Sequence, residues 1–367
     1  METISFYSYK GGTGRTLLLA NIAHYLARFG QKVVVLDFDL EAPGLHHKFK
    51  VGGCGDPVRI ERGLVDYIYE FSDKDKIAKD LAPYLISVPV ARAAKGTIQL
   101  FPAGDSPSRD YWKKLLGINW QQMLYGPGAP GVLFFRELKE RIREEIRADF
   151  LLIDSRTGVT EMGGVAAAIL PEKLVCLLLH NQENIEGARA VLQSIRSVPR
   201  LPPDAKPPEL TVVLSRIPAR LDSKQEQDLI EDVKKCFNKE AENLEDTLQV
   251  SDVFVVHSEP DLQVAERLLI GAERIGGPSL LLDDYIRLAA AIIPMEVLRS
   301  ARELLREGVM TLLDDPEEVQ KNLEMRAERG DQDAKRELVR FHRLRNSPMW
   351  AQLARWMMLW ELLYGDE

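Results

Sequence analysis

The sequence feature that most constrains the fold is a glycine-rich loop near the start of the chain, residues 5–16 (SFYSYKGGTGRT). An apolar run leads into the loop, and residues 17–28 (LLLANIAHYLAR) after it have the composition of a buried helix. Strand, glycine loop and helix in this order form the layout of a phosphate-binding loop. Gly11, Gly12 and Gly14 allow unusual backbone conformations, so N–H groups at the positive end of the helix dipole can point at phosphate oxygens. The sequence therefore predicts a phosphate site in this loop.

The loop departs from the common pattern G-x-x-x-x-G-K-[ST], which would need glycine at Tyr9 and lysine at Arg15. It fits the deviant form K-G-G-x-x-[KR]-[ST], with an additional lysine, Lys10, at its front. In these residues the chain resembles the ParA/MinD family of dimeric ATPases, which belongs to the SIMIBI class of P-loop proteins. The resemblance implies ATP and Mg2+ as cofactors and a nucleotide site formed by Gly11, Gly12, Thr13, Gly14, Arg15, Thr16 and Leu17.

The resemblance also gives three loop residues separate roles. Lys10 is expected to reach across a homodimer, with ATP at the interface, to the partner subunit's nucleotide. Thr16 is expected to give its hydroxyl to Mg2+. Arg15 stands where the family has a lysine, and its planar guanidinium can bind phosphate and assist catalysis through two donors at once. Because arginine is also longer than lysine, we expect ATP to bind and to be hydrolysed slowly.

Acidic residues follow two predicted strands of the chain. Residues 33–36 form an apolar run that ends in Asp37 and Asp39, and residues 150–153 form another that ends in Asp154. Ligands bind at the carboxyl ends of the strands in open α/β sheets. The resemblance implies that Asp37 and Asp154 order Mg2+ and that Asp39 positions or activates the attacking water. The alternative is that Asp37 and Asp39 only cap the following turn.

Five further positions are expected near the nucleotide. Asp154 opens the motif DSRTG, in which Gly158 fits the segment that moves when the γ-phosphate is lost. Arg156 of the same motif either senses the phosphate or the partner subunit, or forms a structural salt bridge. The resemblance assigns the base to Ser215, Arg216 and Pro260, although many family members have an asparagine where this chain has Ser215-Arg216.

Apolar runs alternate with helical patterns over most of the chain. The runs predict strands near residues 4–7, 33–36, 97–102, 150–153, 174–179, 210–214 and 253–256, and helices are predicted at 17–28, 63–71, 131–148, 184–198, 222–243 and 281–293. This alternation predicts a doubly wound, mostly parallel α/β sheet of the P-loop NTPase type. Residues 46–150 form a long insertion that is either a lid or partner surface, or purely structural.

The pattern after the predicted sheet is wholly helical, so we expect an ATPase domain at 1–293 and a C-terminal helical domain at 294–367. Residues 349–364 carry three of the chain's five tryptophans, Trp350, Trp356 and Trp360. Such a helix either packs on its own domain, docks a protein partner or a second copy, or lies on a membrane. A membrane-bound helix would favour lysine and arginine on its polar face, and their scarcity counts against that role.

The composition of the chain bears on DNA binding, on membrane association and on the cellular compartment. The net charge is −8, from 48 Lys and Arg against 56 Asp and Glu, which counts against DNA binding through a globally basic surface. No run of 18 apolar residues is present, and the predicted first strand begins at once, so we expect neither a membrane span nor a signal peptide. The three cysteines are scattered, which indicates a reducing cytoplasm and no cysteine metal site.

Together with these observations, the resemblance to the ParA/MinD family implies a cytoplasmic Mg2+- and ATP-dependent dimeric switch that regulates a partner or effector, as in bacterial signalling or defence. One alternative is a DNA-partition or positioning ATPase, which binds DNA or a membrane. Another is a phosphotransferase, since some bacterial tyrosine kinases share the deviant loop; those carry a C-terminal tyrosine cluster, whereas this chain ends with a single Tyr364.

Overall fold

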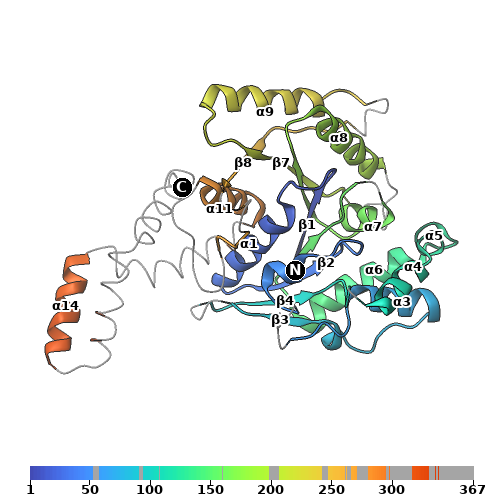
Figure 1. The fold of residues 1–367 in the computed structure, drawn as a ribbon, viewed down its shortest axis with the longest axis horizontal. Coiled ribbons are helices and arrows are strands. Elements are labelled where there is room, and N and C mark those ends of the chain that lie inside the picture. The colour runs from blue at the N-terminus through green and yellow to red at the C-terminus, as the bar shows by residue number, and fades with distance from the viewer. Residues whose placement is uncertain are drawn as a thin grey trace. The chain divides into compact units, whose positions relative to one another are not determined.

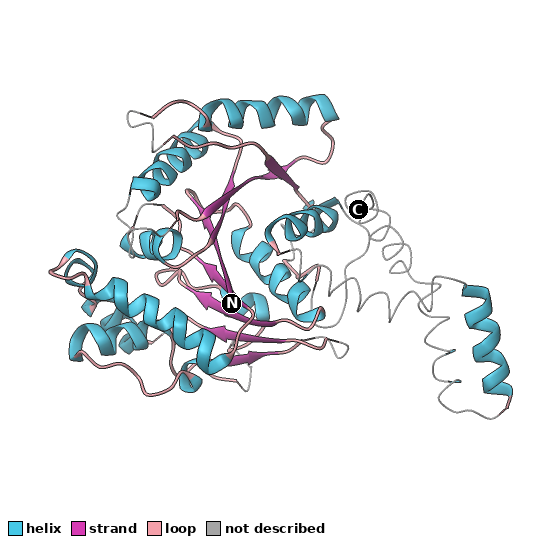
Figure 2. Cartoon of the chain, turned by 180° about the vertical axis from the view of Figure 1, so that it is seen from behind, coloured by secondary structure: helices cyan, strands magenta, loops and turns pink. Residues whose placement is uncertain are grey.

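The described part of the chain contains one large sheet with helices on both faces (Figures 1 and 2). The computed structural model describes residues 1–52, 58–90, 94–106, 108–158, 160–197, 206–241, 247–260, 262, 266–270, 280–294, 297, 316–329, 335 and 338. The strands are β1 (Glu2–Ser8), β2 (Lys32–Asp37), β3 (Ile86–Val88), β4 (Thr97–Phe101), β5 (Phe150–Asp154), β6 (Lys173–Leu178), β7 (Glu209–Ile217) and β8 (Val253–His257). Their order in the sheet is β3-β4-β2-β5-β1-β6-β7-β8.

All neighbouring strands in this sheet are parallel except β3 and β4, which are antiparallel. β1 occupies the middle of the sheet, between β5 and β6, and its six residues from Thr3 to Ser8 are buried. The predicted doubly wound, mostly parallel fold is therefore confirmed. The edge strand β3 was not predicted, because three residues give no periodic pattern.

Helices of the first part of the chain cover the two faces of the sheet. They are α1 (Arg15–Arg28), α2 (Leu45–Phe49), α3 (Leu64–Lys74), α4 (Arg109–Gly117), α5 (Trp120–Tyr125), α6 (Pro130–Arg141), α7 (Glu161–Gly164), α8 (Gln182–Ser197) and α9 (Ser223–Phe237). α1 lies on one face, while α3, α6 and α8 lie on the other (Figure 1). The core of that second face joins apolar side chains of β2 and β5 to α3 and α6, and those of β6 and β7 to α8 and α9.

The predicted helix at 131–148 is present in two pieces. α6 ends at Arg141 and continues as a π-helical turn, Ile142–Ile146. A second π-helical turn, Val165–Ile169, extends α7. Such turns insert an extra residue per turn, which a 3.6-residue apolar pattern does not reveal.

A buried amide connects α1 to a distant part of the chain. The Asn21 side chain donates to the carbonyl of Leu17 at 2.7 Å, and its oxygen accepts the N–H groups of Leu269 and Ile270 at 2.8 and 2.7 Å. Asn21 is fully buried. Because a buried amide without partners is costly, these hydrogen bonds hold residues 269–270 firmly against the helix that follows the glycine loop.

The chain divides into two compact units, Met1–Glu273 and Arg274–Glu367. The second unit contains α11 (Leu280–Ile292), predicted at 281–293 within the ATPase domain, and α14 (Pro316–Glu328), which lies in the predicted C-terminal helical region. The domain boundary after residue 293 stays a prediction. The tryptophan-rich segment at 349–364 lies outside the described residues. Among the residues that are described, no helix is both long and apolar enough to cross a membrane.

Candidate functional site

The glycine loop forms an open cradle between β1 and α1. Gly12 and Gly14 have φ of 79° and 84°, values that favour glycine, and Gly14 directly precedes the first turn of α1. A Cβ atom added to Gly11, Gly12 or Gly14 would meet no heavy atom within 4 Å. No side chain caps the start of α1. Open space beside the uncapped N–H groups of a helix suits an anion, so the loop fits the phosphates of a nucleotide.

Two buried carboxylates lie side by side at the carboxyl ends of adjacent strands. Asp37 of β2 and Asp154 of β5 are opposite each other in the parallel register, and their exposed fractions are 0% and 1%. Burial, and next the nearby Asp154, raise the pKa of Asp37 well above its usual range, although the N–H groups of Leu45 and Asp39 partly offset this. The hydroxyl of Thr16 donates to Asp154 Oδ2 at 2.7 Å. The structure therefore brings the three predicted metal residues to one place.

Arg15 points at carboxylates. Its Nε donates to Asp154 Oδ1 at 2.6 Å and its Nη2 to Asp39 Oδ2 at 3.2 Å, while Nη1 is 3.4 Å from the Ser8 hydroxyl. Burial lowers the pKa of Arg15, but Asp154 and Asp39 together raise it by a larger amount. The pKa of Arg15 is therefore above its usual value. For Asp39, burial raises the pKa and Arg15 opposes that rise. The predicted role of Arg15 in binding phosphate stays a prediction.

Lys10 lies at the exposed front of the loop. Its Nζ is 2.6 Å from Glu183 Oε1 at the start of α8, and the two side chains are 45% and 70% exposed. The hydrogen bond to Glu183 raises the pKa of Lys10. An exposed ion pair of this kind is weak, so it leaves Lys10 free to exchange partners. The predicted contact across a dimer stays a prediction.

Tyr9, where the common pattern has glycine, packs its ring against α8. A Cβ atom added to Gly187 of α8 would lie 2.2 Å from the nearest atom of that ring. Gly187 thus makes room for Tyr9, a pairing between distant positions that the local sequence pattern does not reveal.

This packing predicts that Gly187→Ala displaces Tyr9 and lowers the free energy of unfolding by about 1–3 kcal/mol, as overpacking does in a close-packed region. Urea unfolding measures the change. The matched control is Gly187→Ala combined with Tyr9→Ala, in which the added methyl group has room and the double variant should lose less than the two single losses summed. Additive losses would contradict the packing.

The three residues assigned to the base lie on β7 and after β8, and β7 is separated from β5 by β1 and β6 in the sheet. Ser215 is buried and its hydroxyl donates to the carbonyl of Leu178 at 3.2 Å. Arg216 is exposed at an irregularity in the pairing of β7 with β8 and has φ of 59°. Pro260 is exposed after β8. Their role in recognising a base stays a prediction.

The long insertion supports the backbone that carries Asp37 and Asp39. The buried Tyr111 hydroxyl donates to the carbonyl of Leu40 at 2.5 Å. Gly104, with φ of 141°, lies under the Tyr111 ring, where a Cβ atom would come within 2.9 Å of it. These contacts give Gly104 and Tyr111 a structural role within the insertion at 46–150, for which the sequence left a lid, a partner surface and a purely structural role open.

The loop after β5 is tied to the loop after β2. Arg156 forms an ion pair with Glu41, and the N–H of Gly158 is 3.4 Å from the carbonyl of Ser8. One of the roles predicted for Arg156 was a structural salt bridge, and the ion pair with Glu41 agrees with that role. Whether it also senses phosphate or a partner stays a prediction.

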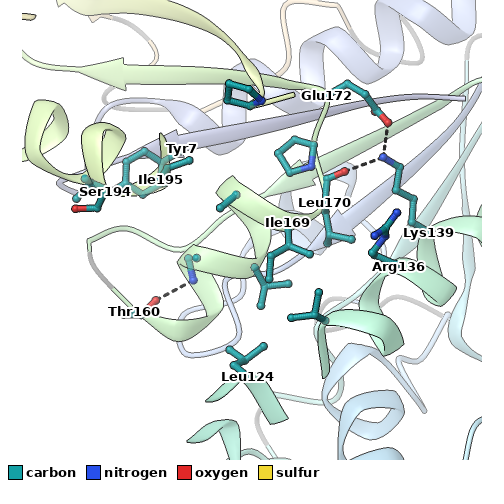
Figure 3. A pocket seen from close by; sticks show the side chains of 18 of the residues that line it. Tyr7, Leu124, Arg136, Lys139, Thr160, Ile169, Leu170, Glu172, Ser194 and Ile195 are labelled. Carbon is teal, nitrogen blue, oxygen red and sulfur yellow. Dashed lines mark hydrogen bonds and ion pairs between the residues drawn. The ribbon is translucent and has the colours of Figure 1, made fainter. Parts of the chain in front are cut away.

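A cavity of about 1350 Å³ opens on the face of the sheet covered by α6, α7 and α8 (Figure 3). Apolar side chains such as Leu124, Ile169 and Ile195 line it, and the ion pair of Lys139 with Glu172 lies at its edge. It approaches the glycine loop at Tyr7, but Arg15, Asp39 and Asp154 are not among its lining residues. The acidic cluster of Asp37, Asp39 and Asp154, and not the cavity, is therefore the candidate site.

Within the described residues, no group of three or more His, Cys, Asp and Glu side chains is arranged to hold a metal ion unaided. A magnesium ion here would depend on Thr16, on the carboxylates and on oxygens from a nucleotide or water. That is the manner in which Mg2+ is usually held beside phosphates, so the residues fit the ion.

Comparison with known proteins agrees with this geometry. The sequence profile of the CobQ/CobB/MinD/ParA nucleotide binding domain matches residues 4–281. An uncharacterised ATP-binding protein of Methanocaldococcus jannaschii is 34% identical over 92 residues, and a virulence plasmid ParA family protein of Chlamydia trachomatis is 32% identical over 105 residues. These matches cover 23% and 28% of this chain, and 35% and 33% of those relatives, so the chain spans only about a third of the relatives' length.

Solved structures share the fold. The septum site-determining protein MinD of Pyrococcus horikoshii, solved with Mg-ADP, has a TM-score of 0.53 at 16% identity, covering 80% of this chain and 97% of that one. A variant of McdA from Cyanothece, solved with ATP, has a TM-score of 0.53 at 17% identity, covering 80% of this chain and 98% of that one. With the profile match, the fold and the cradle in agreement, the chain belongs to the CobQ/CobB/MinD/ParA nucleotide-binding domain family.

Proposed function

We propose that this chain is a Mg2+- and ATP-dependent switch that binds ATP, dimerises around it and hydrolyses it slowly. The observation that carries the proposal is the 2.7 Å hydrogen bond from Thr16 to Asp154 beside the open glycine cradle. A hydroxyl at the start of the loop helix and an aspartate at the end of a buried strand are the residues that hold Mg2+ in P-loop proteins.

The chain's own residues would divide the work between them. Mg2+, when bound, would neutralise charge on the phosphates of ATP. N–H groups of the loop would hold the phosphates, and Thr16 and Asp154 would hold the ion. Asp39 would orient or activate the attacking water, for which its position at the carboxyl end of β2 is suited. Lys10, exposed and weakly paired, would contact the nucleotide of the other subunit.

The output of the switch is proposed to be a protein partner or effector bound by residues 294–367. The support is the density of tryptophan at 349–364, a residue that often anchors protein interfaces. Partition or positioning on DNA is the second candidate, because the family includes ParA and MinD by name. The net charge of −8 counts against it, since binding to DNA relies on positive charge.

Measurement of ATP turnover tests the proposal. We expect slow release of phosphate with Mg2+, none with EDTA, and no change when DNA is added. Turnover that rises severalfold with DNA would favour the partition function. Failure to bind ATP in the presence of Mg2+, measured by calorimetry, would exclude both functions, and GTP in place of ATP is the control for the base.

A further inference from the structure

Negative charge is concentrated around the Arg15 guanidinium in the candidate site. Asp37, Asp39 and Asp154 lie at the ends of β2 and β5, and Asp37 and Asp154 are buried. Arg15, with a side chain only 7% exposed, forms ion pairs with two of these three carboxylates. Buried carboxylates need a counter-ion, because leaving a buried charge unpaired is strongly destabilising.

The guanidinium binds the same oxygen atoms that the proposed function requires. Asp154 uses one oxygen for Arg15 Nε, at 2.6 Å, and the other for the Thr16 hydroxyl. Asp39 Oδ2 is 3.2 Å from Arg15 Nη2. A metal ion held through Asp154, or a water activated by Asp39, would therefore have to share or replace these contacts.

We propose that Arg15 is an internal counter-ion that competes with Mg2+ for Asp154 and Asp39, so that the ion binds tightly only when a nucleotide draws the guanidinium away. The second half of this statement rests on the proposed function, since the phosphates of a nucleotide are the alternative partner for Arg15. Mg2+ and nucleotide would then each strengthen the binding of the other, because both favour the displaced arginine.

Arginine suits this role better than lysine. The planar guanidinium carries donors in different directions, and here Nε and Nη2 serve two separate carboxylates. A lysine has a shorter side chain that ends in one compact ammonium, so it would neutralise one carboxylate well and the other poorly. The replacement of the usual lysine thus changes what holds the acidic cluster together, in addition to the contact with phosphate.

Binding of Mg2+ alone, without any nucleotide, tests the competition. We expect the wild type to bind Mg2+ weakly in calorimetry and to keep its unfolding midpoint when MgCl2 is added. Arg15→Gln should bind Mg2+ at least about tenfold more tightly, the change expected from removing one charge-assisted contact. Its midpoint should be lower in EDTA and should rise with MgCl2. Arg15→Lys, the matched control that keeps the charge, should lie between the two.

A second pair of variants keeps the test decisive if Arg15→Gln unfolds in EDTA. Arg15→Gln combined with Asp39→Asn has one carboxylate fewer to neutralise, so it should regain much of the lost midpoint, whereas Asp39→Asn alone should change it less than Arg15→Gln. Equal Mg2+ affinity in the wild type and Arg15→Gln, or in the wild type and Arg15→Lys, would overturn the proposal. A loss of stability without any change in Mg2+ affinity would also overturn it, since that is the result for an arginine that only packs.

The result of the Mg2+ calorimetry does not depend on whether the proposed function is correct. The calorimetry contains no ATP, so a chain that never hydrolyses ATP can still show the competition. Conversely, a chain that hydrolyses ATP normally while Arg15→Gln leaves Mg2+ binding unchanged would retain its proposed function and lose this role for Arg15.

Discussion

Asp154→Ala is expected to reduce Mg2+-dependent ATP turnover by roughly a hundredfold or more, because it removes a carboxylate proposed to hold the metal. Thr16→Ala should act in the same direction, since its hydroxyl is hydrogen-bonded to that carboxylate at 2.7 Å. The measurement is phosphate release at saturating ATP over a titration of MgCl2. Both variants should need more Mg2+ than the wild type to reach half of their own maximal rate.

The control for this prediction separates the metal from the fold. Thr16→Ser keeps the hydroxyl and should remain close to the wild type. Asp154→Ala also leaves Arg15 with fewer partners, so thermal unfolding must show that the variant is folded under the conditions of the assay. Turnover and Mg2+ dependence that are unchanged in both alanine variants would contradict the metal assignment.

Asp39→Ala and Lys10→Ala are expected to shift the mass of the protein in opposite directions when ATP is present. Loss of Asp39 should slow hydrolysis roughly a hundredfold, the effect of losing a general base, and should leave the phosphates bound, so that the ATP-bound dimer accumulates. Loss of Lys10 should weaken the dimer by about one to two decades in its association constant, the effect of losing one charge-assisted contact. Light scattering at matched, saturating ATP measures both.

Glu183→Gln is the matched control for Lys10. It removes the ion pair that Lys10 makes within its own subunit, at 2.6 Å, and keeps Lys10 itself. The dimer of this variant should therefore be at least as strong as that of the wild type. If the wild type and all three variants stay monomeric with ATP at high protein concentration, the dimeric switch is excluded and the chain acts as a monomer.

The elements of the sheet could be predicted because each is encoded by its own local pattern. Continuous apolar runs indicate the buried parallel strands, and the glycine loop is recognisable by its spacing. Contacts between distant positions have no such signature. The hydrogen bond of Arg15 with Asp154 joins residues 139 apart, and the pairing of Tyr9 with Gly187 joins a loop to a helix that packs on it only after folding. The sequence therefore predicted that Thr16, Asp37 and Asp154 would lie close together, and it did not predict that Arg15 would contact carboxylates.

In the insertion at 46–150 the local elements could likewise be predicted, whereas the contacts between distant positions could not. Its strand Thr97–Phe101 and its longest helix follow from apolar patterns, although the helix is divided by a π-helical turn. The function of Tyr111 depends on the carbonyl of Leu40, which is 71 residues away, and no spacing rule could identify that partner.

The buried Asn21 side chain bears on how the chain is assembled during its synthesis. Its oxygen accepts N–H groups from Leu269 and Ile270, which leave the ribosome 248 and 249 residues later. β1, made first, likewise waits for β5 and β6 as its neighbours in the sheet. Since domains fold as units during translation, we expect α1 to gain these contacts only after residue 270 has been made, and until then the nascent chain exposes its central strand, β1, to chaperones.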